Sequence, residues 1–365
     1  MPYNPNELAV YIHWPFCKSK CPYCDFYKEV RRNVNQDEII DRYIADLSKY
    51  HKITNDRTVK SIFFGGGTPS LIEPRNIEKI INHIGKIWHV KSNAEISLEA
   101  NPNTHAASIF RELKLSGINR LSLGVQALNE DDLRFLGRTH NLETARLCLK
   151  EITEIFDNHS ADLIYARPGQ NLQNWQQELQ EITSYGLHHI SLYQLTIEPN
   201  TVFARKNIQP LNDESAAEMY NFTRDFLTSF GYEHYEVSNF AQTGYQSTHN
   251  LTYWQGGDYI GIGTSAHGRL KLGNRHIATV YPFEHENLSA EQRAEELIIM
   301  GLRLTQGINL QDFKQICGLD FHSFVNRRKL QDLKDMKLLA QSDTHVYPTY
   351  EGMLVLNEII SELCS

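Results

Sequence analysis

Residues 14–26 read W-P-F-C-K-S-K-C-P-Y-C-D-F, a stretch with three cysteines at the spacing C-x3-C-x2-C. The cysteines are Cys17, Cys21 and Cys24, and a fourth cysteine would extend the pattern at position 26, where the chain has Phe26. Thiolates are soft ligands that favour zinc, copper(I) and iron–sulfur clusters. The stretch therefore predicts a metal site close to the N-terminus.

Two kinds of metal site fit a cysteine triplet. A structural zinc ion takes four ligands, usually from two Cys-x2-Cys pairs, and no second pair lies nearby. His13, four residues before Cys17, could supply the fourth zinc ligand. Three thiolates in one loop suit a [4Fe–4S] cluster in which one iron stays open for an exchangeable ligand. We expect the cluster and keep zinc as the alternative.

The first half of the chain alternates short apolar runs with longer amphipathic segments. The runs that predict strands are Leu8–His13, Ser61–Phe64, Ala94–Glu99, Arg120–Val125, Ala161–Tyr165 and His189–Leu195. The segments that predict helices are Gln36–Tyr50, Arg75–Trp88, Thr104–Leu115, Leu142–Phe156 and Leu172–Tyr185. Such alternation is typical of βα units and a parallel sheet. Six units predict an α/β fold, a partial (βα)6 TIM-like barrel two units short of closure.

Glycines and polar side chains follow the predicted strands. In barrel proteins the carboxyl ends of the strands carry the functional site, so these residues are candidates. Glu99 and Asp162 can accept hydrogen bonds from ammonium or hydroxyl groups, and Gln126 can both donate and accept. Arg138 suits a carboxylate, because its planar guanidinium pairs with both oxygens.

The pattern changes after residue 211. Asp213–Phe230 predicts a further helix, and an aromatic-rich and a Gly-rich segment follow it. The C-terminal part predicts four helices, Gln292–Leu304, Asn309–Cys317, Phe321–Met336 and Thr349–Leu363. Between the last two helices, Leu338–Pro348 predicts a short hairpin. We expect a core domain over 1–235, a connecting segment over 236–290 and a small α+β, winged-helix-like module over 291–365.

Winged helices often bind DNA, but the charge of the module argues against that function. Residues 291–365 hold eight Lys and Arg against eleven Asp and Glu. An acidic module is a poor ligand for phosphates. We therefore predict a lid or docking module and no nucleic-acid partner.

The whole chain of 365 residues has a net charge of −8 and 41% hydrophobic residues. It contains no run of about 18 apolar residues, the length that a membrane helix needs. Its first residues lack the basic start and apolar stretch of a secretory signal. We expect a cytoplasmic protein that does not span a membrane.

The cysteine motif, with Tyr23 directly before its third cysteine, resembles the signature of the radical S-adenosylmethionine (SAM) superfamily. That resemblance implies that Cys17, Cys21 and Cys24 bind a [4Fe–4S] cluster, whose open iron is chelated by the amino and carboxylate groups of SAM. An electron from the cluster then cleaves SAM to methionine and a 5′-deoxyadenosyl radical. The resemblance implies that SAM is bound by Tyr11, Tyr23, Gly66, Gly67, Thr68, Glu99, Gln126, Arg138 and Asp162.

Further motifs narrow the resemblance. Nearly the whole chain is similar to the oxygen-independent coproporphyrinogen III oxidase family, on the motifs Y-I-H-W-P-F-C, C-P-Y-C-D-F, G-G-G-T-P-S, R-L-S-L-G-V-Q, L-G-R-T-H and D-L-I-Y-x-x-P-G-Q. One departure is Ala166-Arg167, where the family usually has Gly-Leu. The extra cation could meet an anionic ligand or form a salt bridge.

The family has an oxidase branch and a branch of HemW-type heme chaperones. The oxidases carry a fourth cysteine where this chain has Phe26, and a longer segment before the cluster loop. Residues 249–254 read H-N-L-T-Y-W and match the H-N-x-x-Y-W motif of the chaperone branch. Imidazole and phenolate are known axial ligands of heme iron, and aromatic rings offer a flat surface to a porphyrin. The candidates for heme binding are therefore His249, Tyr253 and Trp254.

His249 and Tyr253 are four residues apart and would share one face of a helix. The alternative interpretation of the motif is an aromatic latch between barrel and C-terminal module. We predict a heme chaperone with a SAM-ligated cluster, whose partners are heme, a reductant and a heme-accepting protein such as a membrane-associated respiratory one. Oxidative decarboxylation of coproporphyrinogen III is the alternative, and a cluster-containing DNA-binding regulator is a third.

Overall fold

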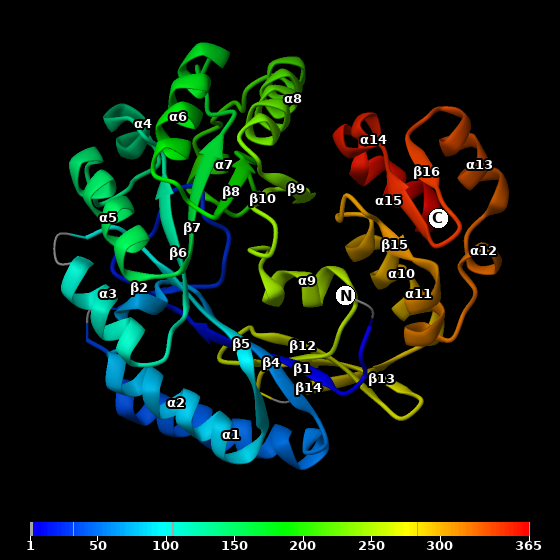
Figure 1. Ribbon diagram of the computed structural model, residues 1–365, viewed down its shortest axis with the longest axis horizontal. Coiled ribbons are helices and arrows are strands. Elements are labelled where there is room, and N and C mark those ends of the chain that lie inside the picture. The colour runs from blue at the N-terminus through cyan, green and yellow to red at the C-terminus, as the bar shows by residue number, and fades with distance from the viewer. Residues whose placement is uncertain (1–2, 32, 104–105, 283, 365) are drawn as a thin grey trace.

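The computed structural model describes residues 3–31, 33–103, 106–282 and 284–364 (Figure 1). Its main feature is a sheet of twelve strands in the order β14-β13-β12-β11-β1-β4-β5-β6-β7-β8-β10-β9. A small two-stranded sheet pairs β2 (Phe16–Cys17) with β3 (Glu29–Val30), on either side of the cysteine loop.

The six predicted strands are confirmed, and they form the centre of the large sheet. They are β1 (Glu7–Trp14), β4 (Thr58–Gly66), β5 (His89–Ala100), β6 (Arg120–Gln126), β7 (Asn158–Tyr165) and β8 (His189–Gln194). Each pairs in parallel with the next in that order, so all six carboxyl ends lie at one edge. Trp14 lies beside Gly66 in this register, which brings the start of the cysteine loop next to the G-G-G-T segment.

The predicted helices lie along one face of this sheet, on its outside (Figure 1). They are α1 (Gln36–Thr54), α2 (Pro74–Ile87), α3 (Ala106–Leu115), α5 (Leu142–Ile155), α6 (Leu172–Ser184) and α8 (Asp213–Ser229). Thr104, predicted to begin α3, is outside the described residues. Asn141 and Asn171 cap the N-termini of α5 and α6, because their side chains accept hydrogen bonds from the backbone amides of Thr144 and Asn174. Short helices absent from the prediction are η1 (Pro69–Leu71), α4 (Glu130–Phe135) and α7 (Val202–Arg205).

Residues 233–288 add strands to both ends of the sheet. The strands are β9 (Glu233–Glu236), β10 (Asn239–Ala241), β11 (Tyr259–Ile262), β12 (His267–Leu272), β13 (Arg275–Val280) and β14 (Glu284–Leu288). β11 pairs in parallel with β1, and β10 pairs antiparallel with β8. The predicted connecting segment therefore carries sheet strands together with helix α9 (Thr248–Trp254). The boundaries at 235 and 290 remain predictions.

The C-terminal module has a hydrophobic core of its own, separate from that of the sheet. Its helices are α10 (Ala290–Gly301), α11 (Leu310–Cys317), α12 (Phe321–Phe324), α13 (Arg327–Asp335), α14 (Tyr350–Leu354) and α15 (Leu356–Cys364). Its strands are β15 (Ile308–Asn309), β16 (Leu339–Gln341) and β17 (His345–Pro348), in the order β15-β17-β16, and the last two form the predicted hairpin.

Two helices predicted as continuous in this module are each broken in the structure. Phe321–Met336 breaks because Val325 is extended and the Asn326 side chain caps a new helix, accepting from the amides of Arg328 and Lys329. Thr349–Leu363 breaks at Val355, which leaves the helical conformation. None of the described helices combines the length and the apolar character that crossing a bilayer requires.

Candidate functional site

The three cysteines lie in the loop that leaves β2. Cys17 is buried, whereas Cys21 and Cys24 are partly exposed. The Thr68 hydroxyl donates to the Cys17 Sγ at 3.4 Å, and the Arg138 guanidinium donates to the Cys21 Sγ at 3.6 Å. Hydrogen bonds and a cation beside sulfur stabilise thiolates, so the surroundings of the triplet fit metal-ligating cysteines.

The spacing of potential ligands bears on the kind of metal site. Within the described ranges, no three His, Cys, Asp or Glu side chains are grouped as ligands of a single ion. A [4Fe–4S] cluster sets a different requirement, because each cysteine sulfur binds a separate iron atom. His13, the residue considered as a zinc ligand, bonds elsewhere: Nδ1 lies 2.9 Å from the Tyr11 hydroxyl and Nε2 lies 3.2 Å from the Tyr27 carbonyl oxygen.

The G-G-G-T segment packs closely against the start of the cysteine loop. Gly66 has a φ of +108°, and a Cβ there would lie 2.6 Å from the His13 ring. A Cβ on Gly67 would lie 2.8 Å from the Phe16 carbonyl oxygen. The amide of Gly66 donates to Glu99 and that of Gly67 to the Trp14 carbonyl. Both glycines are thus required by backbone geometry, and both amides already have acceptors.

Arg138 joins the cysteine loop to the sheet. Its guanidinium donates to the Tyr23 hydroxyl at 3.4 Å, to the Gly124 carbonyl at 2.8 Å and to the Asn101 side chain. Asn101 in turn donates to the Thr68 hydroxyl at 3.3 Å. The Nε of Arg138 is buried and has no hydrogen-bond partner in the described structure. A buried N–H donor without an acceptor is costly, so this atom is ready to donate to an anionic ligand.

A cavity of about 130 Å³ opens inside the barrel beyond this loop. Its lining brings together three SAM candidates, Tyr11, Glu99 and Asp162, with His249 and Tyr253 from α9. Burial, and then the nearby Asp162, raises the pKa of Glu99 to about 8. Burial also raises the pKa of Asp162, although Ser191 and Ser122 donate hydrogen bonds to it. Two carboxyls with raised pKa values favour a cationic ligand, which would stabilise their ionised forms.

His249 is enclosed in this cavity. Its ring stacks on Phe63, with centroids 4.9 Å apart, and the side chain is 1% exposed. Nδ1 lies 3.0 Å from the Ser61 hydroxyl and Nε2 lies 2.5 Å from the Tyr253 hydroxyl. Burial, with Lys60 and Arg120 nearby, lowers the pKa of His249 to about 3. The imidazole is therefore neutral, but both of its nitrogens already have partners.

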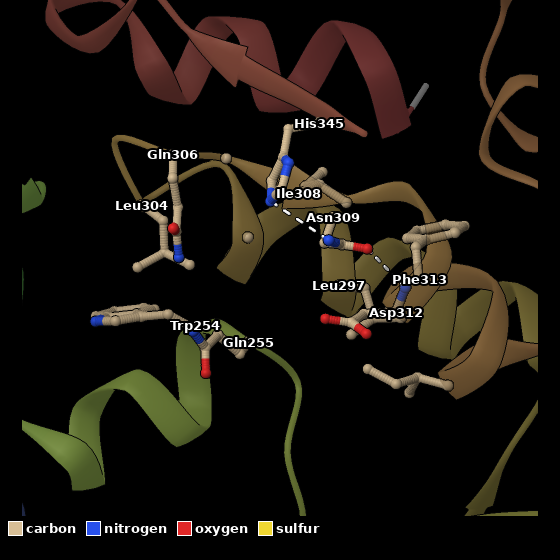
Figure 2. Close-up of a pocket in the computed structure, with 13 residues that line it drawn as sticks. Trp254, Gln255, Leu297, Leu304, Gln306, Ile308, Asn309, Asp312, Phe313 and His345 are labelled. Carbon is tan, nitrogen blue, oxygen red and sulfur yellow. Dashed lines mark hydrogen bonds between the residues drawn. The ribbon is translucent and has the colours of Figure 1, made fainter. Parts of the chain in front are cut away.

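Trp254 lies apart from the other two heme candidates. It lines a second cavity of about 270 Å³, between the end of α9 and the C-terminal module (Figure 2). The H-N-x-x-Y-W motif forms helix α9, the condition under which His249 and Tyr253 share one face. Its residues face two different cavities, so the structure does not gather all three candidates around one ligand.

Comparison with known proteins identifies the family. Residues 11–182 match the radical SAM superfamily, and residues 288–355 match the HemN C-terminal domain. A heme chaperone HemW of Buchnera aphidicola subsp. Schizaphis graminum is 43% identical over 271 residues, 74% of this chain and 72% of that protein. The heme chaperone HemW of Haemophilus influenzae is 34% identical over 99% of this chain and 98% of that protein. This chain belongs to the HemW family.

The HemW-family chain also shares its fold with a solved structure of coproporphyrinogen III oxidase (HemN) from Escherichia coli. The TM-score is 0.82, over 99% of this chain and 90% of that one, at 21% identity. This similarity confirms the predicted radical SAM fold with its C-terminal module, and it concerns the fold alone.

Arg167 has a structural role in this HemW-family chain. It is completely buried, donates to the Ile164 carbonyl at 2.7 Å, and forms ion pairs with Glu178 and, at 2.9 Å, with Asp132. Of the two interpretations of this cation, the structure supports the salt bridge.

Several residues of the candidate site were missing from the prediction. Asn101, between Thr68 and Arg138, stands two positions after Glu99 and could have been found from that spacing. Ser122 lies two positions before Gly124 on a predicted strand, and strand alternation could have placed it on the inner face. The other cavity-lining residues missing from the prediction are Phe63, Arg120, His189, Ser191, Tyr193 and Asn250, of which Arg120 and Asn250 stand within quoted motifs.

Proposed function

We propose that this chain binds heme and delivers it to an acceptor protein, and that it holds a [4Fe–4S] cluster whose open iron binds SAM. The observation that carries the proposal is the position of the H-N-L-T-Y-W motif. It forms α9, which contacts the barrel strand β4 on one side and α10 of the C-terminal module on the other. Relatives named as heme chaperones support the assignment of heme as the cargo.

Cys17, Cys21 and Cys24 are the proposed cluster ligands. When bound, the cluster supplies the electron that can cleave SAM. The chain's own contribution is to stabilise negative charge on sulfur: Thr68 donates to the first thiolate and Arg138 to the second. Thr68 follows β4 and Arg138 lies in the loop between α4 and α5, so the folded barrel is needed to assemble the site.

The proposed SAM site lies between the cluster loop and the barrel cavity. The free Nε of Arg138 is available to the carboxylate of SAM. An ammonium group donates hydrogen bonds and amide N–H groups cannot accept them, so the loop would contact the SAM ammonium group through oxygen atoms, including the Thr68 hydroxyl. Glu99 and Asp162 lie where they can accept from ammonium or ribose hydroxyls. The remaining proposed contacts are Tyr11, Tyr23 and Gln126.

The proposed partners are a reductant for the cluster and a heme-accepting protein, in the cytoplasm or at its membrane surface. Nucleic acid is not among them, since the C-terminal module is acidic.

The second candidate function is oxidative decarboxylation of coproporphyrinogen III, which the fold shared with HemN favours. Phe26, at the position of a fourth cysteine, argues against it. Its side chain is 68% exposed and brings no thiol to the loop. We rank heme carriage first.

A heme titration tests the proposal. The anaerobically reconstituted full chain is titrated with Fe(III) protoporphyrin IX, and the Soret band is followed. Carriage predicts a shifted band that saturates at about one heme per chain. An unshifted band, identical to that of free heme, would remove heme carriage as the function.

A further inference from the structure

The second cavity has features of a ligand site in its own right. It lies between α9 and the C-terminal module, and Leu304, Ile308 and Phe313 give it apolar walls (Figure 2). The exposed Gln306 stands at its rim, so the cavity reaches solvent. None of the proposed cluster or SAM residues lines it.

The indole of Trp254 forms one flat wall of this cavity, across from His345 (Figure 2). The Arg303 guanidinium lies 5.9 Å from the centre of the Trp254 ring. The indole Nε1 is buried and has no hydrogen-bond partner among the described residues. A flat apolar wall suits a planar ligand, and a guanidinium that lies over the same ring, although outside the cavity lining, adds positive charge nearby.

The Nε2 of His345 faces an amide group in the same cavity. The Asn309 Oδ1 caps α11, accepting from the amides of Gln311 and Asp312, each at 2.9 Å. The Asn309 Nδ2 therefore faces the His345 Nε2, at 3.5 Å, and a donor in that place requires Nε2 to be the acceptor. The proton then sits on Nδ1, 2.9 Å from the Thr344 hydroxyl.

This arrangement matches that of a histidine ready to bind iron. A ligating imidazole offers one nitrogen to the metal and is oriented by a hydrogen bond from the other ring N–H. Ligation by His345 would displace only the long contact to Asn309. Ligation by His249 would break a buried 2.5 Å contact to Tyr253 or a 3.0 Å contact to Ser61.

We propose that heme binds in this cavity, with the Nε2 of His345 as an axial ligand of the iron and the indole of Trp254 packed against the porphyrin. The inference rests on the proposed function and names the site of the cargo. A porphyrin is larger than the cavity, so part of the ring extends past Gln306 into solvent. A partly exposed heme suits a protein that must hand its cargo on.

The test compares two porphyrins on three proteins. Wild type, His345→Ala and His285→Ala, each as the full chain with its cluster reconstituted, are titrated with Fe(III) protoporphyrin IX and with metal-free protoporphyrin IX. His285 is an exposed histidine on β14 and serves as the matched control. Far-UV circular dichroism and thermal melting establish that the variants are folded; His345 is on a short strand and only partly buried, so we expect normal folding.

Loss of the axial ligand should weaken binding of the iron porphyrin roughly tenfold or more and shift its Soret band, with metal-free porphyrin binding unchanged. His285→Ala should bind both porphyrins with the same affinity and spectra as wild type. Equal affinity and spectra for wild type and His345→Ala would overturn the inference and leave heme carriage standing. An equal loss for both porphyrins would show that His345 shapes the cavity rather than ligating iron, and would also overturn it. A wild type that binds no iron porphyrin would instead refute the proposed function.

Discussion

His249 and Trp254 lie at opposite ends of α9 and line different cavities. His249 faces the barrel cavity beside Tyr11, and Trp254 faces the cavity of the C-terminal module. α9 therefore contacts both the proposed SAM region and the proposed heme region. The position of this helix is set by Glu95 on β5, whose carboxylate accepts from the amides of Thr248 at 2.9 Å and His249 at 3.1 Å.

Replacing Glu95 with alanine should release the start of α9. Glu95 is buried, lies 3.9 Å from the buried Arg120, and pairs with two amides that would lose their acceptor. We expect the free energy of unfolding to fall by about 3 kcal/mol. We also expect weaker heme binding, because Trp254 is displaced. Urea unfolding and heme titration measure the two effects.

Glu95→Gln is the conservative comparison, since its amide oxygen can still accept from one backbone amide. It should lose less stability than Glu95→Ala. Equal stability of wild type and Glu95→Ala would contradict the role given to this carboxylate.

Cys21→Ser should abolish the cluster. Serine replaces one soft thiolate with a hydroxyl, so one of the three irons that the cysteines bind would lose its protein ligand. Anaerobic reconstitution of wild type should give about four irons per chain in a colorimetric iron assay, against close to none in the variant. Cys364→Ser, which changes a cysteine in α15 far along the chain, should keep the wild-type iron content. A wild type that takes up only zinc would refute the cluster.

Gly66→Ala should destabilise the protein by about 1–3 kcal/mol, because alanine is strained at a φ of +108° and its Cβ would collide with the His13 ring. Gly85→Ala, in α2, is the control. A Cβ there meets open space, and alanine favours helix, so this variant should gain up to about 1 kcal/mol. Chemical denaturation measures the free energy of unfolding of both variants and of wild type. A Gly66→Ala protein as stable as wild type would show that the loop is not strained.

The raised pKa of Glu99 predicts that SAM affinity depends on pH. The ordinary pKa of this carboxyl is 4.5, and burial raises it to about 8, so at neutral pH the group is largely protonated. A sulfonium or ammonium group nearby favours the ionised form. SAM should therefore bind more tightly as pH rises from about 6.5 to 8.5, by at most roughly tenfold per pH unit. Isothermal titration calorimetry measures this.

Glu99→Gln removes the titrating group and should flatten that pH profile. Its unliganded stability gives the second readout. Between pH 4.5 and about 8 the unfolded chain has lost the Glu99 proton while the folded chain keeps it, so wild-type stability falls as pH rises through this range. The free energy of unfolding of Glu99→Gln should therefore increase relative to that of wild type as pH rises through this range. Parallel stability profiles would contradict the raised pKa.

Arg167→Ala should cost about 3–5 kcal/mol of unfolding free energy, since it leaves the buried Glu178 without its cation. SAM affinity should stay unchanged, because Arg167 contacts no proposed SAM residue. Arg146→Ala breaks the more exposed pair with Glu181 and should cost about 1 kcal/mol or less. Lost SAM binding by a folded Arg167→Ala protein would restore the anionic-ligand interpretation of this residue.

The central strands and the helices between them could be predicted from sequence, because their apolar periodicity and residue types agree with the final fold. The strand β11 could not. It lies in a Gly-rich segment, where a Cβ on Gly261 would come within 2.3 Å of the His267 carbonyl oxygen. Glycine is required there by close packing between strands, whereas locally it weakens the strand signal.

The second cavity is the largest omission. Trp254 was noticed within its motif, but His345 and Asn309 lie 91 and 55 positions further along the chain, in a predicted hairpin and at the start of a predicted helix, and neither belongs to a motif. Tertiary packing alone brings these residues together, so no local rule predicts them. The break at Asn326 in the C-terminal module has a different cause, the preference of an asparagine side chain for capping a helix start.

One measurement separates a heme carrier from a porphyrin oxidase most directly. The reduced, cluster-reconstituted chain is incubated anaerobically with SAM, coproporphyrinogen III and heme, passed through gel filtration, and both fractions are analysed by liquid chromatography. Heme carriage predicts that heme elutes with the protein and that coproporphyrinogen III is recovered unchanged. Protoporphyrinogen formed over several turnovers, with heme left in the small-molecule fraction, would contradict it.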